Sequence, residues 1–264
     1  MSVRSPFTLP PRIGLPTQVY PELPLGEALE RLAPYTQLVE IDSFGLHTVL
    51  SLRNRNVALG SRLRLTVHGP YGHDIDPANP DESLRRFTVD QHRRHLAAAA
   101  ELGALVYVAH SDYRPPPAPR DPARVAAMQR TIADLEALQA EYGVPIGVEN
   151  MPGQGIGTFT APGDLELGEL GLTLDVGHAA VSGTLDGFLA DPHGRLIHMH
   201  LHSNRGTIDT DDPHAPLGSG IVDAPAALAL AGAAGATVIL EHLDEAAMLA
   251  SLAYVEEHGL ADLL

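Results

Sequence analysis

Short apolar segments alternate with segments of helical character along almost the whole chain. We expect the apolar segments to form strands at 12–19, 37–41, 62–67, 104–109, 146–149, 172–175, 196–201 and 237–241. We expect helices at 25–32, within 45–59, and at 81–102, 122–142, 162–170, from about 177, 225–233 and 245–258. Short apolar strands that alternate with helices form a parallel sheet, and eight such units close a barrel. The pattern therefore predicts an α/β fold, a single (β/α)8 TIM barrel whose one domain spans residues 1–264.

The alternative is an open, doubly wound sheet. The dinucleotide-binding pattern G-x-G-x-x-G, which is typical of such sheets, does not follow the first expected strand. The barrel remains the favoured fold.

Two residue types are missing, and their absence excludes several chemistries. The chain has no cysteine, which excludes disulfides, thiolate nucleophiles and cysteine-type zinc sites. It also has no lysine, because all 17 basic residues are arginines. Schiff-base chemistry and a Walker A phosphate loop are therefore excluded as well.

The charge and the hydropathy of the chain limit its partners. A net charge of -16 disfavours a broad surface for the phosphate backbone of nucleic acid, so DNA is a possible but disfavoured partner. The N-terminal residues lack the features of a signal peptide, and no apolar run approaches the roughly 18 residues of a membrane span. We expect a cytoplasmic protein with no membrane contact.

Metal-ligating residue types stand at the ends of six expected strands. These residues are His68, His110, Glu149, Asp175, His200 and Glu241. The C-terminal ends of barrel strands are where such folds place their active sites. Because side chains alternate along a strand, His198, His200 and His202 share one face, which points into the barrel. Nitrogen and oxygen ligands of this kind suit Zn²⁺ or Mn²⁺, and the sequence leaves open both that choice and whether His202 replaces His200 as a ligand.

Three further candidates lie outside the strands. His178 follows Asp175 by three residues, in the first turn of the next expected helix. Asp212 and His214 form an Asp-x-His unit in a long polar loop. The glycine-containing segment 217–220 can bring this loop back over the mouth of the barrel.

Several short motifs in a fixed order resemble those of the xylose isomerase-like barrel superfamily. They are Val67-His68-Gly69-Pro70-Tyr71, Glu101-Leu102-Gly103-Ala104 up to His110, Glu149-Asn150 with Gly153-Gln154-Gly155, Asp175-Val176-Gly177-His178-Ala179, Met199-His200-Leu201, Asp212-Pro213-His214 up to Gly220, and Leu240-Glu241. The ligand pattern is most similar to that of the endonuclease IV group within this superfamily.

The resemblance implies a site with up to three metal ions. One ion would be held by His68, His110 and Glu149, with Glu149 as a bridging ligand. A second would use Glu149, Asp175, His200 and Glu241, and a third His178, Asp212 and His214. Sugar isomerases and epimerases of the same superfamily typically keep one metal, at positions that match the second set.

The expected number of ions decides the expected substrate. One divalent ion leaves Glu149, Asp175 and Glu241 with a net negative charge, which suits a neutral sugar. Three ions make the site positive even with Asp212 included, which attracts a phosphate. The sequence therefore favours a metal-dependent phosphoesterase of the endonuclease IV type, acting on abasic-site DNA or a smaller phosphoester. The alternative is a single-metal sugar or sugar-phosphate isomerase or epimerase in which Glu149 and Glu241 are catalytic and transfer a proton.

Two departures from the endonuclease IV pattern weaken the DNA-specific role. The first strand, Ile13-Gly14-Leu15-Pro16-Thr17, lacks the histidine- and glycine-rich start of that group. The segment after His200 reads His202-Ser203-Asn204, where that group usually has Asn-Asp.

Overall fold

A computed structural model describes residues 8–72, 74–112, 121–153, 157–192, 195–205 and 213–263. The strands are β1 (Ile13–Pro16), β2 (Leu38–Asp42), β3 (Arg64–His68), β4 (Tyr107–His110), β5 (Ile146–Glu149), β6 (Gly171–Asp175), β7 (Leu196–Leu201) and β8 (Thr237–Leu240). The α-helices are α1 (Leu25–Leu32), α2 (Leu52–Gly60), α3 (Glu82–Glu101), α4 (Pro122–Tyr142), α5 (Val176–Val181), α6 (Leu185–Ala190), α7 (Ala224–Ala234) and α8 (Glu245–Glu257). Short 3-10 helices cover Thr17–Val19, Gly45–His47 and Leu260–Leu263.

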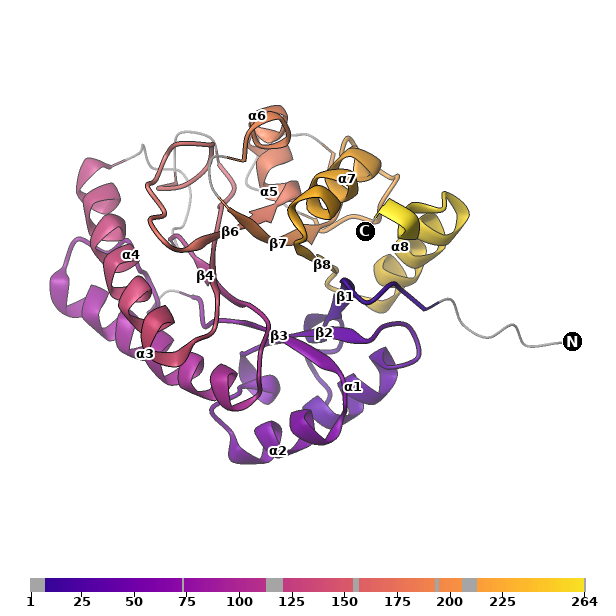
Figure 1. Cartoon of the computed structure of the whole chain (residues 1–264), viewed down its shortest axis with the longest axis horizontal. Helices are drawn as coiled ribbons and strands as arrows, with labels where there is room; N and C mark the ends of the chain where they lie inside the picture. Colours follow the sequence, from indigo (N-terminus) through magenta and orange to yellow (C-terminus); the bar gives the residue numbers. More distant parts are fainter. Residues whose placement is uncertain are drawn as a thin grey trace, which may run out of the picture.

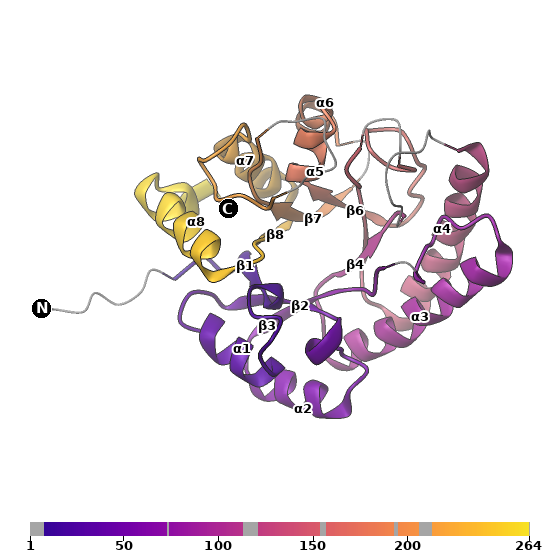
Figure 2. The ribbon, with the colours of Figure 1, turned by 180° about the vertical axis from the view of Figure 1, so that it is seen from behind.

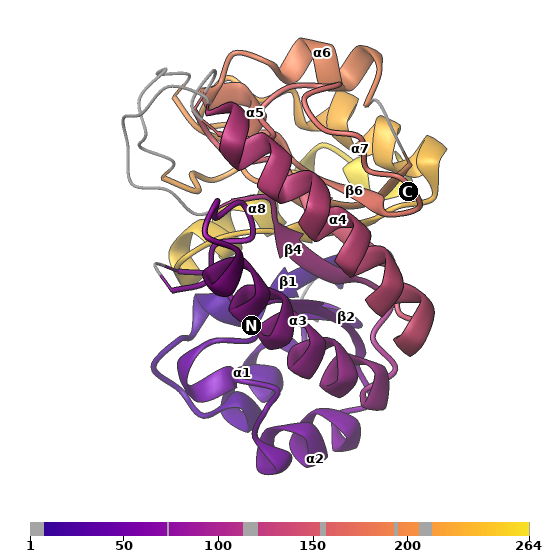
Figure 3. The ribbon, with the colours of Figure 1, turned by 90° about the vertical axis from the view of Figure 1, so that its left-hand side faces the viewer.

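The strands form a closed parallel barrel in the order of the sequence, so the predicted (β/α)8 TIM barrel is confirmed. Each strand pairs with the next, and β1 closes the ring by pairing with β8. Figure 1 shows the strands in the centre with the helices around them, and Figure 2 shows the same ring from behind. In Figure 3 the long helices α3 and α4 run side by side on one flank.

Local signals at the helix ends explain why most predicted boundaries hold. Asp81 precedes α3, and its carboxylate accepts hydrogen bonds from the backbone N–H groups of Ser83 and Leu84. Pro122 occupies the first turn of α4, where it costs no hydrogen bond. Gly143 ends α4 with a φ of 71°, a left-handed conformation that glycine adopts without strain.

The helix predicted at 162–170 was wrong. The segment is irregular, and two helices, α5 and α6, instead follow β6. Gly163 and Gly168 have φ values of 81° and 57°, which break a right-handed helix. Side chains of α4 take the place of helical hydrogen bonds: Gln129 bonds both the N–H and the carbonyl of Glu166, and Glu136 accepts from the N–H of Glu169.

Apolar residues fill the space between the strands and the helices, while part of the barrel interior is polar. Val39, Ile41 and Met199 are examples of such fully buried strand residues. Glu40, Thr66 and His198 are also almost completely buried, so their polar atoms must form hydrogen bonds with one another. None of the helices in the described part of the chain is long and apolar enough to cross a membrane.

A buried histidine on α3 packs against β4 of the barrel. Nδ1 of His92 lies 2.9 Å from the hydroxyl of Tyr107 in β4, and the imidazole is almost fully buried. Burial lowers the pKa of His92 to about 3, with His95 and His68 acting in the same direction. The folded protein therefore holds this imidazole neutral at pH values where the unfolded chain protonates it.

Acid should destabilise the protein partly through His92. The unfolded histidine binds a proton as the pH falls through about 6.5, whereas the folded one does not. This single group should cost about 2 kcal/mol of unfolding free energy between pH 7 and pH 5. Urea titrations at both pH values should show that His92→Gln loses about 2 kcal/mol less than the native chain on acidification. The exposed His258→Gln is the control, and equal losses in all three proteins would contradict the assignment.

Candidate metal centre

The strand-end residues predicted from the sequence converge on one cavity. Parallel pairing sets His110 beside Glu149 and Asp175 beside His200. The cavity has a volume of about 130 Å³. It is lined by Gln18, Asp42, His68, Tyr71, His110, Glu149, His178, His214 and Glu241. Asp175 and His200 are fully buried against these residues.

The carboxylate of Glu149 lies between two groups of imidazoles. Its Oε2 is 3.4 Å from Nε2 of His68 and 3.5 Å from Nε2 of His110. Its Oε1 is 3.4 Å from Nδ1 of His200 and 3.5 Å from Nδ1 of His178. Each oxygen thus faces its own set of nitrogens, which is the placement that a bridging carboxylate requires.

The first of these sets brings lone pairs close together. Nδ1 of His68 lies 2.9 Å from the carbonyl oxygen of Gly69 and donates to it, so Nε2 faces the cavity. The Nε2 atoms of His68 and His110 are only 3.2 Å apart, beside the carboxylate of Glu149. Burial lowers the pKa of His68, but Glu149 and Asp42 outweigh it and raise that pKa to about 9; burial lowers the pKa of His110 to about 3. A proton or a cation between these atoms would remove their repulsion, and the three atoms together could hold a divalent cation.

The second set surrounds Nδ1 of His200 with carboxylates. This nitrogen lies 3.2 Å from Oε2 of Glu241, 3.4 Å from Oε1 of Glu149 and 3.9 Å from Oδ2 of Asp175. Nδ1 of His200, Oε2 of Glu149 and Oε2 of Glu241 are buried and form no hydrogen bond within the part of the chain that the structure describes. Polar atoms that are buried without partners are costly, and a divalent cation would satisfy all of them. The residues present therefore fit such an ion.

Burial and neighbouring charges separate the pKa values of the two glutamates. Burial raises the pKa of Glu241 to about 8, with Asp175 and Glu149 adding to the rise and His200 opposing it. Burial acts on Glu149 in the same direction, but His200 and His110 outweigh it and hold its pKa well below the usual range. A bound cation would lower both pKa values, because it favours the ionised carboxylate.

The third predicted set is described only in part. Asp212 lies outside the described residues. Nδ1 of His178 lies 2.9 Å from the carbonyl oxygen of Asn150 and donates to it, which sets the tautomer of the ring. His214 has a φ of 44°, an uncommon conformation for a residue other than glycine. Within the described residues, His178 groups with Glu149 and Asp175, and His214 with His202 and Glu241, so a third ion stays a prediction.

A family model described as a xylose isomerase-like TIM barrel matches residues 43–258. The chain belongs to this family. The resemblance predicted from the order of the motifs is thereby confirmed. The assignment of individual residues of this xylose isomerase-like barrel to individual ions stays a prediction.

Its relatives carry names from two kinds of chemistry. An uncharacterised protein of Methanocaldococcus jannaschii is 30% identical over 218 residues, covering 80% of this chain and 84% of that protein. A probable endonuclease 4 of Mycobacterium leprae is 30% identical over 209 residues, covering 72% of this chain and 77% of that protein. The crystal structure of a D-tagatose 3-epimerase-like protein has a TM-score of 0.78 and 25% identity, covering 94% of this chain and 96% of that one.

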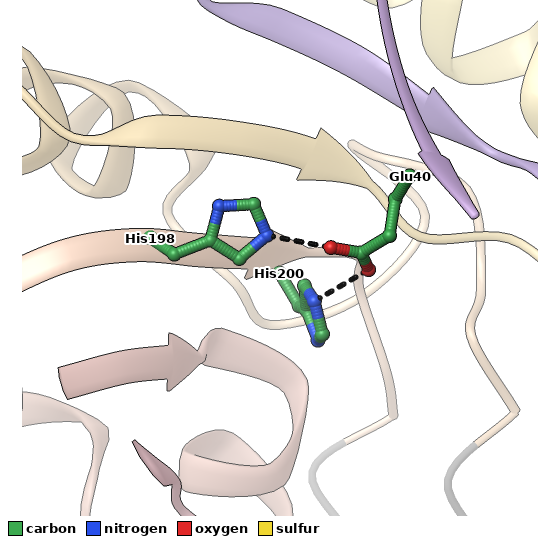
Figure 4. Close-up of side chains that lie close together, drawn as sticks. All are labelled: Glu40, His198 and His200. Carbon is green, nitrogen blue, oxygen red and sulfur yellow. Dashed lines mark hydrogen bonds and ion pairs between the residues drawn. The ribbon is translucent and has the colours of Figure 1, made fainter. Parts of the chain in front are cut away.

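Below the cavity, the buried carboxylate of Glu40 contacts two histidines of β7, and it is not among the site residues predicted from the sequence. Oε2 of Glu40 accepts hydrogen bonds from His198 and Thr66 at 3.0 and 2.9 Å. Oε1 lies 2.9 Å from Nε2 of His200, and Figure 4 shows the carboxylate between the two imidazoles. Burial would raise the pKa of Glu40, but His200 and His198 outweigh it and hold that pKa well below its usual range. The alternation of Val39 and Ile41 with inward-facing Glu40 was the signal that could have revealed it.

This contact determines which nitrogen of His200 faces the cavity. With Nε2 directed at Glu40, Nδ1 is the atom directed at Glu149 and Glu241. Carboxylates that hold the second nitrogen of a ligating histidine fix its tautomer and orientation. Glu40 is therefore placed as a positioning residue for His200.

His202 occupies a different place from His200. Its Nε2 lies 3.2 Å from the carboxylate of Asp175. Its ring stacks on that of His214, with the ring centroids 4.1 Å apart and the ring planes at 12° to each other. Among the described residues, His202 lies with His214 and Glu241 in a group that could hold an ion. The ring also fills the space where a side chain on Gly177 would lie, since a Cβ there would be 1.9 Å from it. His200 contacts both Glu149 and Glu241, whereas His202 contacts Asp175 and groups with His214 and Glu241, so the choice between the two histidines as ligand stays a prediction.

Glu40→Gln should weaken metal binding without unfolding the barrel. The amide keeps the size of the side chain but directs a donor at one of the imidazoles, which removes the fixed orientation of His200. Calorimetric titration of metal-stripped protein with Mn²⁺ should show an affinity roughly 10- to 100-fold lower.

The exposed Glu256→Gln is the matched control and should bind Mn²⁺ as the native chain does. A folded Glu40→Gln with native affinity would show that Glu40 does not act on the centre.

Proposed function

We propose that this protein is a metal-dependent sugar epimerase or isomerase in which Glu149 and Glu241 transfer a proton at the carbon beside a carbonyl group. The observation that carries the proposal is the placement of the two carboxylates. Both are buried, both line the same small cavity, and both lie within 3.4 Å of Nδ1 of His200. Such a pair can act on one substrate from two sides.

The lining of the cavity supports a sugar over a phosphate. Three carboxylates line it, those of Asp42, Glu149 and Glu241, and Asp175 lies directly beneath. No arginine is found among the described residues that line it. The likeness in fold to a D-tagatose 3-epimerase-like protein, at 25% identity, supports the same choice.

The proton transfer needs a base on one face of the carbon and an acid on the other. The ionised carboxylate takes the proton, and the electron pair left on carbon is delocalised onto the carbonyl oxygen. The second glutamate then returns a proton to the opposite face, which inverts the configuration. A divalent cation held by Glu149, Asp175, His200 and Glu241 would supply a Lewis acid for the carbonyl oxygen.

The two glutamates can be tested separately in deuterium oxide. Each of Glu149→Gln and Glu241→Gln should lower epimerisation of the best ketose by roughly 10²- to 10⁴-fold. Each should also abolish solvent exchange starting from only one of the two epimers, because each carboxylate serves one face. Proton NMR of Mn²⁺-loaded protein measures both rates.

Bound Mn²⁺ should be quantified in each variant, since both residues are also predicted ligands. Glu256→Gln should retain both rates. The absence of exchange with the metal-loaded native chain across a panel of free ketoses would contradict the proposal.

A phosphoesterase of the endonuclease IV type is the second candidate. It is favoured by the complete set of nine ligand types in the sequence and by the 30% identity to a probable endonuclease 4. It requires His178, Asp212 and His214 to hold a further ion, which would make the cavity positive.

Metal content separates the two candidates. A hydrolase of this type should retain three ions per chain and cleave an abasic-site duplex, with the cleavage lost after treatment with a chelator. The sugar enzyme should retain one ion and leave both the duplex and a small phosphodiester intact. Elemental analysis of protein purified without chelator, together with the cleavage assay, decides between them.

A further inference from the structure

One carboxylate of the cavity is not used by the metal centre. Asp42 is the last residue of β2, and its backbone pairs with that of His68 in β3. Its side chain lines the cavity, yet it belongs to none of the groups of potential ligands among the described residues. Oδ2 accepts a hydrogen bond from the hydroxyl of Tyr71 at 3.3 Å, whereas Oδ1 is buried and has no hydrogen-bond partner among the described residues.

The unpartnered oxygen restricts the kind of ligand that fits. A buried carboxylate oxygen without a donor is costly, so a ligand that donates a hydrogen bond there is favoured. A phosphate offers acceptor oxygens and negative charge, so Asp42 would repel it. A sugar hydroxyl donates to the carboxylate and still accepts from a neighbouring group.

The groups around Asp42 are suited to hydroxyl groups. The Tyr71 hydroxyl and the Gln18 amide also line the cavity, and each can both donate and accept. The Tyr71 ring is held in place by stacking on His110, with ring centroids 4.8 Å apart. The Tyr71 ring also stacks on the ring of Phe44, with centroids 6.2 Å apart, and Phe44 is 64% exposed. The subsite is thus formed by residues at or just beyond the ends of β1, β2 and β3, and its tyrosine ring packs directly on His110 of the metal centre.

We infer that Asp42, Tyr71 and Gln18 form a binding subsite for the hydroxyl groups of an unphosphorylated sugar. This inference rests on the proposed sugar chemistry and narrows it, because it excludes sugar phosphates whose phosphate would lie at this side of the cavity. Asp42 acts as the acceptor that selects a neutral polyhydroxylated substrate.

Equilibrium binding tests the subsite without relying on turnover. D-fructose, D-tagatose and D-fructose 6-phosphate are titrated into Mn²⁺-loaded native chain, Asp42→Ala and Asp42→Asn. The native chain should bind at least one free ketose more tightly than the phosphate. Asp42→Ala should lower the affinity for that ketose by about 10- to 100-fold, because the substitution removes a charged hydrogen-bond acceptor. Asp42→Asn keeps the shape of the side chain but removes its charge. It should therefore reduce the difference in affinity between the free and the phosphorylated sugar.

The exposed Asp90→Ala is the matched control, and bound Mn²⁺ should be equal in all variants. Native affinity for the free ketose in Asp42→Ala, or tighter binding of the phosphate by the native chain, would overturn the subsite. Failure of the proposed function has a different outcome, since the native chain would then bind the ketose with the expected dependence on Asp42 but show no solvent exchange.

Discussion

Closure of the barrel is the constraint on which the whole site depends. The pairing of β1 with β8 turns a row of parallel strands into a ring, so their C-terminal ends meet around one axis. Residues as distant in sequence as His68 and Glu241 thereby line the same cavity of about 130 Å³. The register of each pair then determines the depth of each side chain, as in the pairing of Asp175 with His200.

The charges gathered by this closure must be compensated. Glu40, Glu149, Asp175 and Glu241 are all buried, and they face histidines whose protonation they promote and burial opposes. Below the cavity the compensation comes from groups of the protein, because His198 and Thr66 donate hydrogen bonds to Oε2 of Glu40 and Nε2 of His200 lies 2.9 Å from Oε1. At the cavity it is incomplete, since atoms of Glu149, His200 and Glu241 lack hydrogen-bond partners. This difference separates a structural layer of the barrel from one suited to a cation.

The balance of charge also bears on the substrate. A site with several buried carboxylates and few cations favours a neutral ligand unless metal ions reverse its sign. The chain is similar both to a probable endonuclease 4 and to a D-tagatose 3-epimerase-like protein, so similarity alone does not choose between the two kinds of substrate. The unpartnered oxygen of Asp42, which no group of described metal-ligating residues includes, is the local feature that weighs towards a sugar.

The sequence by itself determined the barrel and the kind of residue at its strand ends. The apolar periodicity, the aspartate and glycine caps and the strand-end histidines and carboxylates are local features, and local features are readable along a chain. The helix expected at 162–170 failed because Gly163 and Gly168 take left-handed conformations that side chains of α4 stabilise. Likewise, only the tertiary structure decided that Glu40 holds His200, that His202 contacts Asp175, and that an oxygen of Asp42 has no partner. These are contacts between strands and loops far apart in sequence, and their geometry exists only once the ring has closed.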